Sequence, residues 1–177
     1  DRGEFFTPRN VMKMVVEMIN PKMDERVLDS SCGTGGFLVT AMTHVISELE
    51  REFSAQIGCD RCNWDSNSIR AFNDRISDMA SHYYFGFDIN PDLVKATKMN
   101  MVMNNDGSGN ILQTNSLLPP HEWTDEFRTK LAEAIGIEKS ELRNHNTISY
   151  FDVIVTNEAV ICGLTPEKAC NFKEFAA

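Results

Sequence analysis

The amino-acid sequence predicts an α/β protein with a mainly parallel sheet. Segments with the apolar spacing of helices alternate along the chain with short β-branched and aromatic segments, a pattern typical of strand–helix–strand units. A small-residue, glycine-rich loop follows the first predicted strand. With 177 residues, of which 42% are hydrophobic and 24% charged, the chain is long enough for one domain with its own core.

The first predicted helix covers residues 8–20. Thr7 is suited to its N-cap and Pro8 to its first position, and the Asn20-Pro21 pair ends it. Its apolar residues recur three and four positions apart, as one face of a helix requires. They are Val11, Met14, Val15 and Met18.

The same periodicity predicts further helices at about residues 38–49, 68–81, 91–103 and 125–135. The polar stretch at residues 56–67 lies between the first two of these and indicates an irregular insertion. Asn90 is suited to cap the helix that Pro91 begins. The apolar positions of that helix are Leu93, Ala96, Met99 and Met103.

Strands are predicted at about residues 26–29, 83–88, 110–113 and 150–156. Ligands of parallel α/β sheets bind outside the carboxyl ends of the strands. We therefore expect the residues that contact a ligand in the loops after Leu28, Phe87, Gln113 and Thr156.

The charge balance is acidic, with 17 basic and 26 acidic side chains and a formal net charge of −9. A free-standing nucleic-acid binder usually carries a basic surface, so another domain or subunit would have to supply most contacts with a nucleic-acid backbone. No apolar run approaches the ~20 residues that span a bilayer, and no secretory signal is recognised. These features predict a cytoplasmic protein without membrane contact. The start at Asp1 and the short length indicate a piece of a longer protein.

The cysteines do not predict a disulfide framework, because their number is odd and no secretory signal accompanies them. Cys59 and Cys62 have the spacing of half a zinc knuckle, but no second pair of ligands accompanies them. We predict no metal site and interpret this segment as a turn with two incidental thiols. The five cysteines are Cys32, Cys59, Cys62, Cys162 and Cys170.

The loop at residues 30–36 and the carboxylate of Asp88 favour a nucleoside-containing ligand. Glycines in the loop let a ligand approach the backbone and leave the N–H groups of the next helix free. Asp88 ends the second predicted strand, where a carboxylate can accept hydrogen bonds from both ribose hydroxyls; alternatively it is an acid that favours a helix N-terminus. A P-loop is excluded because no Gly-Lys-Ser/Thr follows, and the third glycine of the dinucleotide fingerprint is missing.

Two motifs carry a specific family resemblance. Gly3-Glu4-Phe5-Phe6-Thr7-Pro8-Arg9 comes before Val27-Leu28-Asp29-Ser30-Ser31-Cys32-Gly33-Thr34-Gly35-Gly36-Phe37-Leu38. In this order the motifs resemble the methylation subunit of type I restriction–modification systems, an N6-adenine DNA methyltransferase. The resemblance covers essentially the whole chain. It implies the Rossmann-like fold of S-adenosylmethionine-dependent methyltransferases, incomplete in this chain.

The resemblance implies that S-adenosyl-L-methionine is the cofactor. The methionine side would be lined by Glu4, Phe5, Phe6, Thr7, Pro8 and Arg9. The loop beneath the cofactor would consist of Asp29, Cys32, Gly33, Thr34, Gly35, Gly36 and Phe37. Asp88 would hold the ribose hydroxyls, and Ile89 would lie against the adenine. The third loop, near the adenine, would consist of Asn110, Ile111, Asn115, Ser116 and Leu117, with Asn115 in place of the family's usual aspartate.

Asn157 is the catalytic residue that the resemblance implies. The family ends this strand with Asn-Pro-Pro and an aromatic residue. The Asn oxygen and the next carbonyl accept the two N–H bonds of the adenine amino group, and the ring stacks on the flipped base. Here Glu158-Ala159-Val160 follows instead. Three explanations are open: residues missing after Asn157, a truncated or frameshifted product, or a divergent and inactive relative.

The resemblance further implies duplex DNA with a flipped-out adenine as substrate, and the specificity and restriction subunits of a type I complex as partners. It divides the chain into a cofactor-binding core, residues 1–157, and a divergent or discontinuous segment, residues 158–177. A non-catalytic cofactor-binding or assembly fragment is the main alternative. A methyltransferase acting on protein glutamine and a nicotinamide-dependent enzyme are more distant ones.

Overall fold

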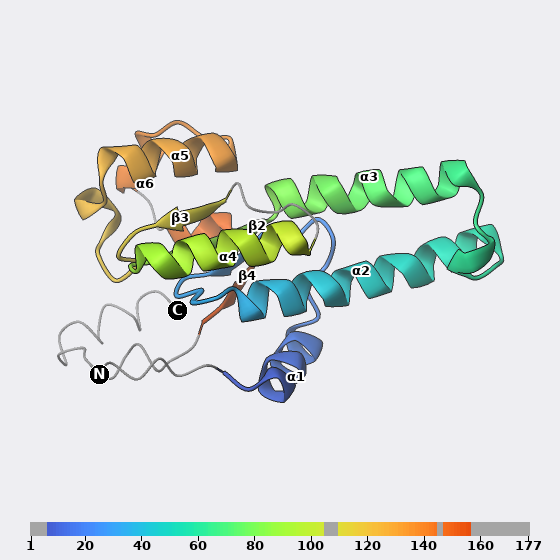
Figure 1. Cartoon of the computed structure of the whole chain (residues 1–177). Helices are drawn as coiled ribbons and strands as arrows, with labels where there is room; N and C mark the ends of the chain where they lie inside the picture. The colour runs from blue at the N-terminus through green and yellow to red at the C-terminus, as the bar shows by residue number, and fades with distance from the viewer. Residues whose placement is uncertain (1–6, 105–109, 145–146, 157–177) are drawn as a thin grey trace.

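The computed structural model describes residues 7–104, 110–144 and 147–156. This part of the chain forms a parallel sheet with helices on both faces (Figure 1), so the predicted α/β fold class is confirmed. The strands lie in the order β3-β2-β1-β4 across the sheet. They are β1 (Val27–Asp29), β2 (Tyr84–Asp88), β3 (Ile111–Gln113) and β4 (Val153–Val155).

The strand register brings the predicted ligand loops to one edge of the sheet. Asp29, the last residue of β1, lies opposite Gly86 of β2 and Val155 of β4, and Asp88 lies opposite Gln113 of β3. The chain winds from β1 outward to β3 and then returns to place β4 on the other side of β1. A ligand crevice is expected where this winding reverses.

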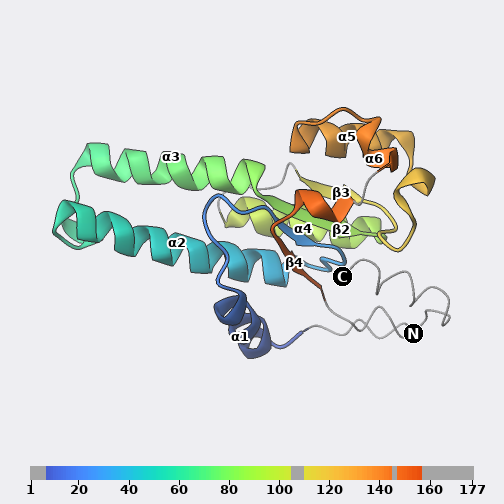
Figure 2. The ribbon, with the colours of Figure 1, turned by 180° about the vertical axis from the view of Figure 1, so that it is seen from behind.

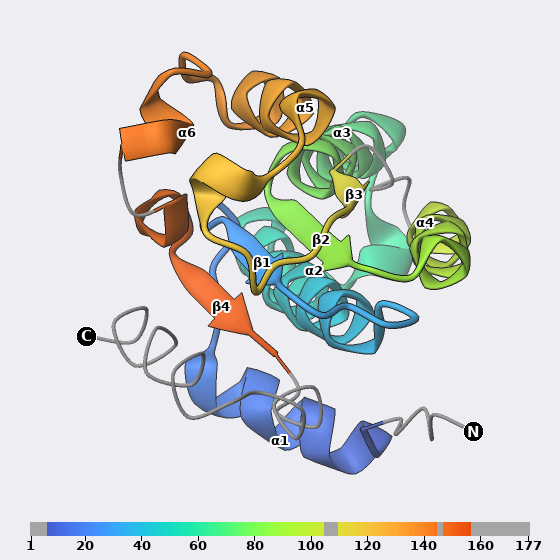
Figure 3. The ribbon, with the colours of Figure 1, turned by 90° about the vertical axis from the view of Figure 1, so that its left-hand side faces the viewer.

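Helices cover both faces of the sheet (Figure 3). Two core clusters fill the space between the sheet and the helices. Along β2, Tyr84 packs in the cluster with α1, α2 and α4, whereas Phe85 and Phe87 pack in the cluster with α5 and α6, as the two-residue period of a strand requires. The helices are α1 (Arg9–Ile19), α2 (Gly36–Ile57), α3 (Ser66–His82), α4 (Pro91–Met103), α5 (Asp125–Ile135) and α6 (Glu141–Asn144), with short 3-10 turns η1 (Arg61–Asn63), η2 (Pro120–Glu122) and η3 (Thr147–Tyr150).

Helix α1 exists as predicted, but its N-cap and its buried face were predicted wrongly. Pro8, not Thr7, occupies the N-cap position, because Pro8 has extended backbone and its carbonyl accepts the first helical N–H groups. Met12 and Val16 are buried, whereas Met14 and Met18 are 54% and 78% exposed. Apolar residues occur on both sides of this helix, so periodicity alone could not select the side that packs on α2.

Helix α4 has the predicted start and a different buried face. The Asn90 side chain accepts a hydrogen bond from the Asp92 N–H and caps the helix, with Pro91 as its first residue. The buried residues are Val94, Thr97 and Met101, not the predicted apolar set, whose members Met99 and Met103 are 69% and 80% exposed. A polar residue, Thr97, therefore lies at the centre of the packed face.

Helices α2 and α3 form an antiparallel arm that extends away from the sheet (Figures 1 and 2). The predicted insertion at residues 56–67 is shorter than expected, because α2 continues to Ile57 and α3 begins at Ser66. The ring of Phe72 lies 5.5 Å from that of Phe53 and 5.2 Å from that of Trp64. This satellite cluster holds the two helices together beyond the edge of the main core.

We expect Phe72→Leu to lower the free energy of unfolding by about 1–2 kcal/mol, because it removes two ring contacts from a fully buried position. Urea denaturation of the wild type and the variant would measure this difference. A loss below about 0.5 kcal/mol, the usual scatter of surface substitutions, would show that the aromatic cluster does not stabilise the arm.

Candidate functional site

The glycine loop, residues 30–36, connects β1 to α2 at the carboxyl edge of the sheet. Gly33 and Gly35 adopt positive φ angles of 53° and 82°, and the Gly35 N–H closes a turn by donating to the Cys32 carbonyl at 2.6 Å. Gly35 is the N-cap residue of α2, and no side chain caps this end of the helix. The N–H groups of its first turn are therefore left for a ligand.

Asp88 holds the glycine loop against the end of β2. One carboxylate oxygen accepts the Gly33 N–H at 2.9 Å and the other accepts the Asn90 N–H at 2.8 Å. Two residues that are 55 positions apart in the sequence, Gly33 and Asp88, are thus brought into contact. Each carboxylate oxygen has a second lone pair, so the half-buried Asp88 can still accept hydrogen bonds from the hydroxyl groups of a ligand.

Asp29 and Cys32 lie beneath the loop and are almost fully buried. Burial raises the pKa of Asp29, the hydrogen bond from the Ser31 N–H lowers it and the charge of Asp88 raises it, and together they place it at about 7. Burial and the charge of Asp29 raise the pKa of Cys32 to about 12. The Cys32 thiol therefore stays protonated at neutral pH, and its Sγ donates to Thr97 Oγ1 at 3.8 Å.

Asp29 should make the stability of the fold depend on pH. Its pKa is 3.8 in the unfolded chain and about 7 in the fold, so between these values the native state binds more protons and the free energy of unfolding falls as pH rises. Asp29→Asn cannot ionise and keeps an oxygen for the Ser31 N–H. We expect the stability of this variant relative to the wild type to increase by about 2 kcal/mol between pH 5 and pH 8. Urea denaturation at four pH values would measure it, and a difference that does not change with pH would contradict a titrating Asp29.

The loop after β3 is tied to the glycine loop. Ser116 Oγ donates to the Ser30 carbonyl at 2.6 Å, and the Thr114 N–H donates to the Asp88 carbonyl at 3.0 Å. Asn115 folds this loop locally, because its side-chain oxygen accepts the Leu117 N–H at 3.1 Å. The structure thus gives Asn115 and Ser116 roles within the protein, and Leu117 lies on the surface, 37% exposed.

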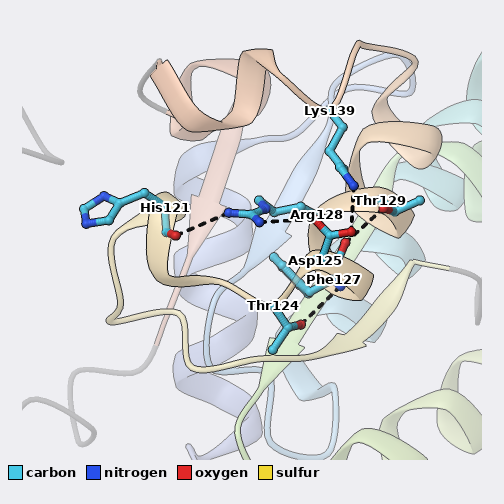
Figure 4. Close-up of polar contacts among 7 residues, drawn as sticks. All are labelled: His121, Thr124, Asp125, Phe127, Arg128, Thr129 and Lys139. Atoms are coloured by element: carbon cyan, nitrogen blue, oxygen red, sulfur yellow. Dashed lines mark hydrogen bonds and ion pairs between the residues drawn. The ribbon is translucent and has the colours of Figure 1, made fainter.

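A tryptophan and a buried arginine hold this third loop on α5, and Figure 4 shows the contacts of the arginine. Trp123 Nε1 donates to the Asn115 carbonyl at 3.2 Å. The Arg128 guanidinium donates to the His121 carbonyl at 3.3 Å and to Asp125 at 3.2 Å. Arg128 is only 6% exposed, and its position was not predicted from the sequence, where it appears in an ordinary polar helix.

Two clefts at the surface of the described residues are lined in part by predicted site residues. One, of about 620 Å³, is lined by Ile89 and Asn115 together with residues of α4 and α5. The other, of about 660 Å³, is lined by Arg9 and Gly36 together with residues of α1, α2 and α4. Ile89 is 63% exposed, so its side chain is free to lie against a ligand.

For several predicted site residues, the structure does not place a side chain where a ligand could contact it. Phe37 packs in the core and is 7% exposed, so only its backbone can reach a ligand. Thr7 and Pro8 precede α1 directly. The predicted residues Glu4, Phe5, Phe6 and Asn157 lie outside the described residues.

Within the described ranges, no group of three or more potential metal ligands occurs. Cys59 and Cys62 lie between α2 and α3, where Cys59 Sγ donates to the Asn63 carbonyl at 3.8 Å. In the same part of the chain, no helix combines the length and apolar character that crossing a bilayer requires.

Two residues of α4 that the sequence did not indicate complete the site. Thr97 Oγ1 donates to the Gly33 carbonyl at 2.6 Å, and Asn100 Nδ2 donates to the Thr34 carbonyl at 3.0 Å. The spacing of Val94, Thr97 and Met101, three and four positions apart, is the signal that could have revealed the packed face of α4.

The fold and the site define an open, doubly wound α/β protein with a glycine loop after β1 and a carboxylate at the end of β2, the class that binds ligands where the winding reverses. The chain belongs to the N-6 DNA methylase family, whose model matches residues 1–159. The family resemblance seen in the sequence is therefore confirmed.

Two relatives show how much of a known protein this chain matches. The methylase subunit of the type I restriction enzyme EcoEI from Escherichia coli is 54% identical over 43 residues, which are 24% of this chain and 9% of that protein. The type II restriction enzyme and methyltransferase RM.BcgI from Heyndrickxia coagulans is 26% identical over 180 aligned positions, 93% of this chain and 24% of that protein. The chain spans less than a quarter of the length of these two relatives.

The structure is also similar to the crystal structure of the M protein of the type I restriction enzyme EcoKI. The TM-score is 0.47 and the identity 23%, over 64% of this chain and 21% of that protein. A modification subunit of a putative type I restriction enzyme from Vibrio vulnificus gives a TM-score of 0.44 and 27% identity, over 71% of this chain and 22% of that one.

Proposed function

We propose that this chain is the cofactor-binding part of an S-adenosylmethionine-dependent methyltransferase that modifies adenine N6 in DNA, as the modification subunit of a type I restriction–modification system. The contact that carries the proposal is the one between Asp88 and the Gly33 N–H, 2.9 Å apart. It joins the two elements, a glycine loop and a strand-end acid, that a nucleoside-containing cofactor requires. Membership of the N-6 DNA methylase family supports the reaction.

The residues present fit this cofactor. The uncapped start of α2 and the N–H groups of Thr34, Gly36 and Phe37 suit its methionine end, and Arg9 lines a cleft together with Gly36. Asp88 has lone pairs for ribose hydroxyls, and Ile89 is exposed at the cleft where an adenine would lie. When bound, the cofactor supplies a methyl group on a sulfonium.

Asn157 is proposed to accept a hydrogen bond from the amino group of an adenine base that is flipped out of the duplex. The methyl transfer would be a direct displacement, so no covalent enzyme intermediate is needed. We further propose that residues 1–157 form the core and that residues 158–177 are a separate segment. With a net charge of −9, the chain would depend on a specificity subunit for most contacts with the DNA backbone, and a restriction subunit would complete the type I complex in the cytoplasm.

The main alternative is a non-catalytic cofactor-binding or assembly fragment. The observation that favours it is Glu158-Ala159-Val160 after Asn157, where the family has Pro-Pro and an aromatic residue. A methyltransferase acting on protein glutamine would need the same Asn-Pro-Pro device, and the Phe-Phe-Thr-Pro-Arg motif argues for DNA instead.

Two measurements test the proposal. Thermal shift with S-adenosylmethionine and with NAD should show stabilisation by the first only, and stabilisation by NAD alone would overturn the proposal. Transfer of a radiolabelled methyl group to adenine in duplex DNA, with a specificity subunit present, tests catalysis. Cofactor binding without transfer would favour the non-catalytic fragment.

A further inference from the structure

We infer that Thr97 of α4 is a positioning residue that orients a peptide group of the glycine loop toward the cofactor. The inference rests on the proposed function, because it concerns how the same loop is presented to S-adenosylmethionine. Thr97 is fully buried and belongs to neither of the sequence motifs that define the site. It is a polar side chain at the centre of the packed face of α4.

The contacts of Thr97 hold the loop at three of its residues. Its hydroxyl donates to the Gly33 carbonyl at 2.6 Å, and it accepts the thiol of Cys32 at 3.8 Å. Its methyl group occupies the space beside Gly35, where an added Cβ would lie 2.8 Å from Cγ2. Asn100 lies one turn further along α4, and its Nδ2 donates a hydrogen bond to the next carbonyl of the loop, that of Thr34, at 3.0 Å.

These contacts determine the direction in which the loop presents its N–H groups. In a trans peptide the C=O and N–H of one unit point to opposite sides. Because the Gly33 carbonyl points to Thr97, the Thr34 N–H of the same unit points away from α4. Within the described part of the chain this N–H donates to no protein acceptor, whereas the Gly33 N–H is held by Asp88. Thr97 therefore directs the Thr34 N–H to the side of the loop opposite α4, where the inference places the cofactor.

Removing the Thr97 hydroxyl should weaken cofactor binding. Thr97→Val keeps both γ positions and the packing against Gly35, but it leaves the Gly33 carbonyl without its donor, so the 33–34 peptide can rotate. We expect the Kd for S-adenosylmethionine, measured by calorimetry on the full chain, to rise about tenfold, roughly the effect of one hydrogen bond. Thr97→Ser keeps the hydroxyl, and we expect its Kd to stay within about threefold of the wild type.

Phe72→Leu is the matched control for stability, because it destabilises the α2–α3 arm without touching the loop. Its Kd should stay within about twofold of the wild type. If Thr97→Val proves too unstable, Asn100→Ala is the second variant. Asn100 is half-buried and its side chain holds the neighbouring Thr34 carbonyl, so we expect its loss to raise the Kd about threefold.

The outcomes separate the two proposals. A wild type that does not bind S-adenosylmethionine overturns the proposed function. A wild type that binds, with Thr97→Val and Asn100→Ala binding equally well, overturns only the role of α4. An equal loss in Thr97→Ser would assign the effect to the methyl group, and an equal loss in Phe72→Leu would assign it to stability; either result overturns the positioning role of the hydroxyl.

Discussion

Asp88→Asn is expected to raise the Kd for S-adenosylmethionine at least about thirtyfold. In the wild type each carboxylate oxygen accepts a backbone N–H, from Gly33 at 2.9 Å and from Asn90 at 2.8 Å. An amide offers one oxygen and one N–H₂ group, so one of these donors would face another donor. Hydrogen bonds to a charged group contribute about 1.5–3 kcal/mol, and the ribose hydroxyls would lose an anionic acceptor as well.

Asp92→Asn is the control for the Asp88 substitution. Asp92 lies in the first turn of α4 and pairs on the surface with Lys95 at 3.2 Å, where an ion pair contributes little. Its replacement removes the same charge near the same helix end, and we expect the Kd to stay within about twofold. Calorimetry would measure both variants. A Kd for Asp88→Asn within threefold of the wild type would mean that Asp88 serves the protein alone.

The parts of the site that the sequence predicted are those with local signals. Asn90 and Pro91 start α4 as predicted, because capping depends on residues next to one another. The approach of Asp88 to the glycine loop was predictable because parallel strands end at one edge of the sheet. Residue 88 also ends its strand as expected.

The parts that the sequence did not predict depend on contacts between distant segments. The predicted buried faces of α1 and α4 were wrong because methionines occur on all sides of these helices. The element that packs against each helix determines which side is buried. For α1 that element is α2, where Gly36 leaves room for Met12; an added Cβ would lie 2.8 Å from its sulfur. For α4 it is the glycine loop, whose carbonyls require a donor, so the polar Thr97 is buried and apolar Met99 is not.

Gly35→Ala is the substitution with the largest expected effect on stability, because α4 packs against the space that a side chain at residue 35 would need. At Gly35 the backbone has φ of 82°, and an added Cβ would lie 2.8 Å from Thr97 Cγ2. The left-handed conformation costs an alanine about 1–2 kcal/mol, and the clash in a packed core adds about 1–3 kcal/mol. We expect urea denaturation to show a loss of about 3 kcal/mol, and cofactor binding to fall with it.

Gly58→Ala separates the two causes, because Gly58 has the same φ of 82° and nothing lies within 4 Å of the added Cβ. Its loss should be the conformational part alone, about 1 kcal/mol. Thr97→Ser removes the methyl group that the new Cβ would meet, so the double variant Gly35→Ala with Thr97→Ser should recover about 1 kcal/mol or more relative to additivity. If the two glycine variants lose equal stability, or the double variant recovers nothing, the close approach of α4 to the loop does not limit residue 35. A recovery of both stability and cofactor binding would instead show that the loop takes its shape from the fit between this glycine and Thr97.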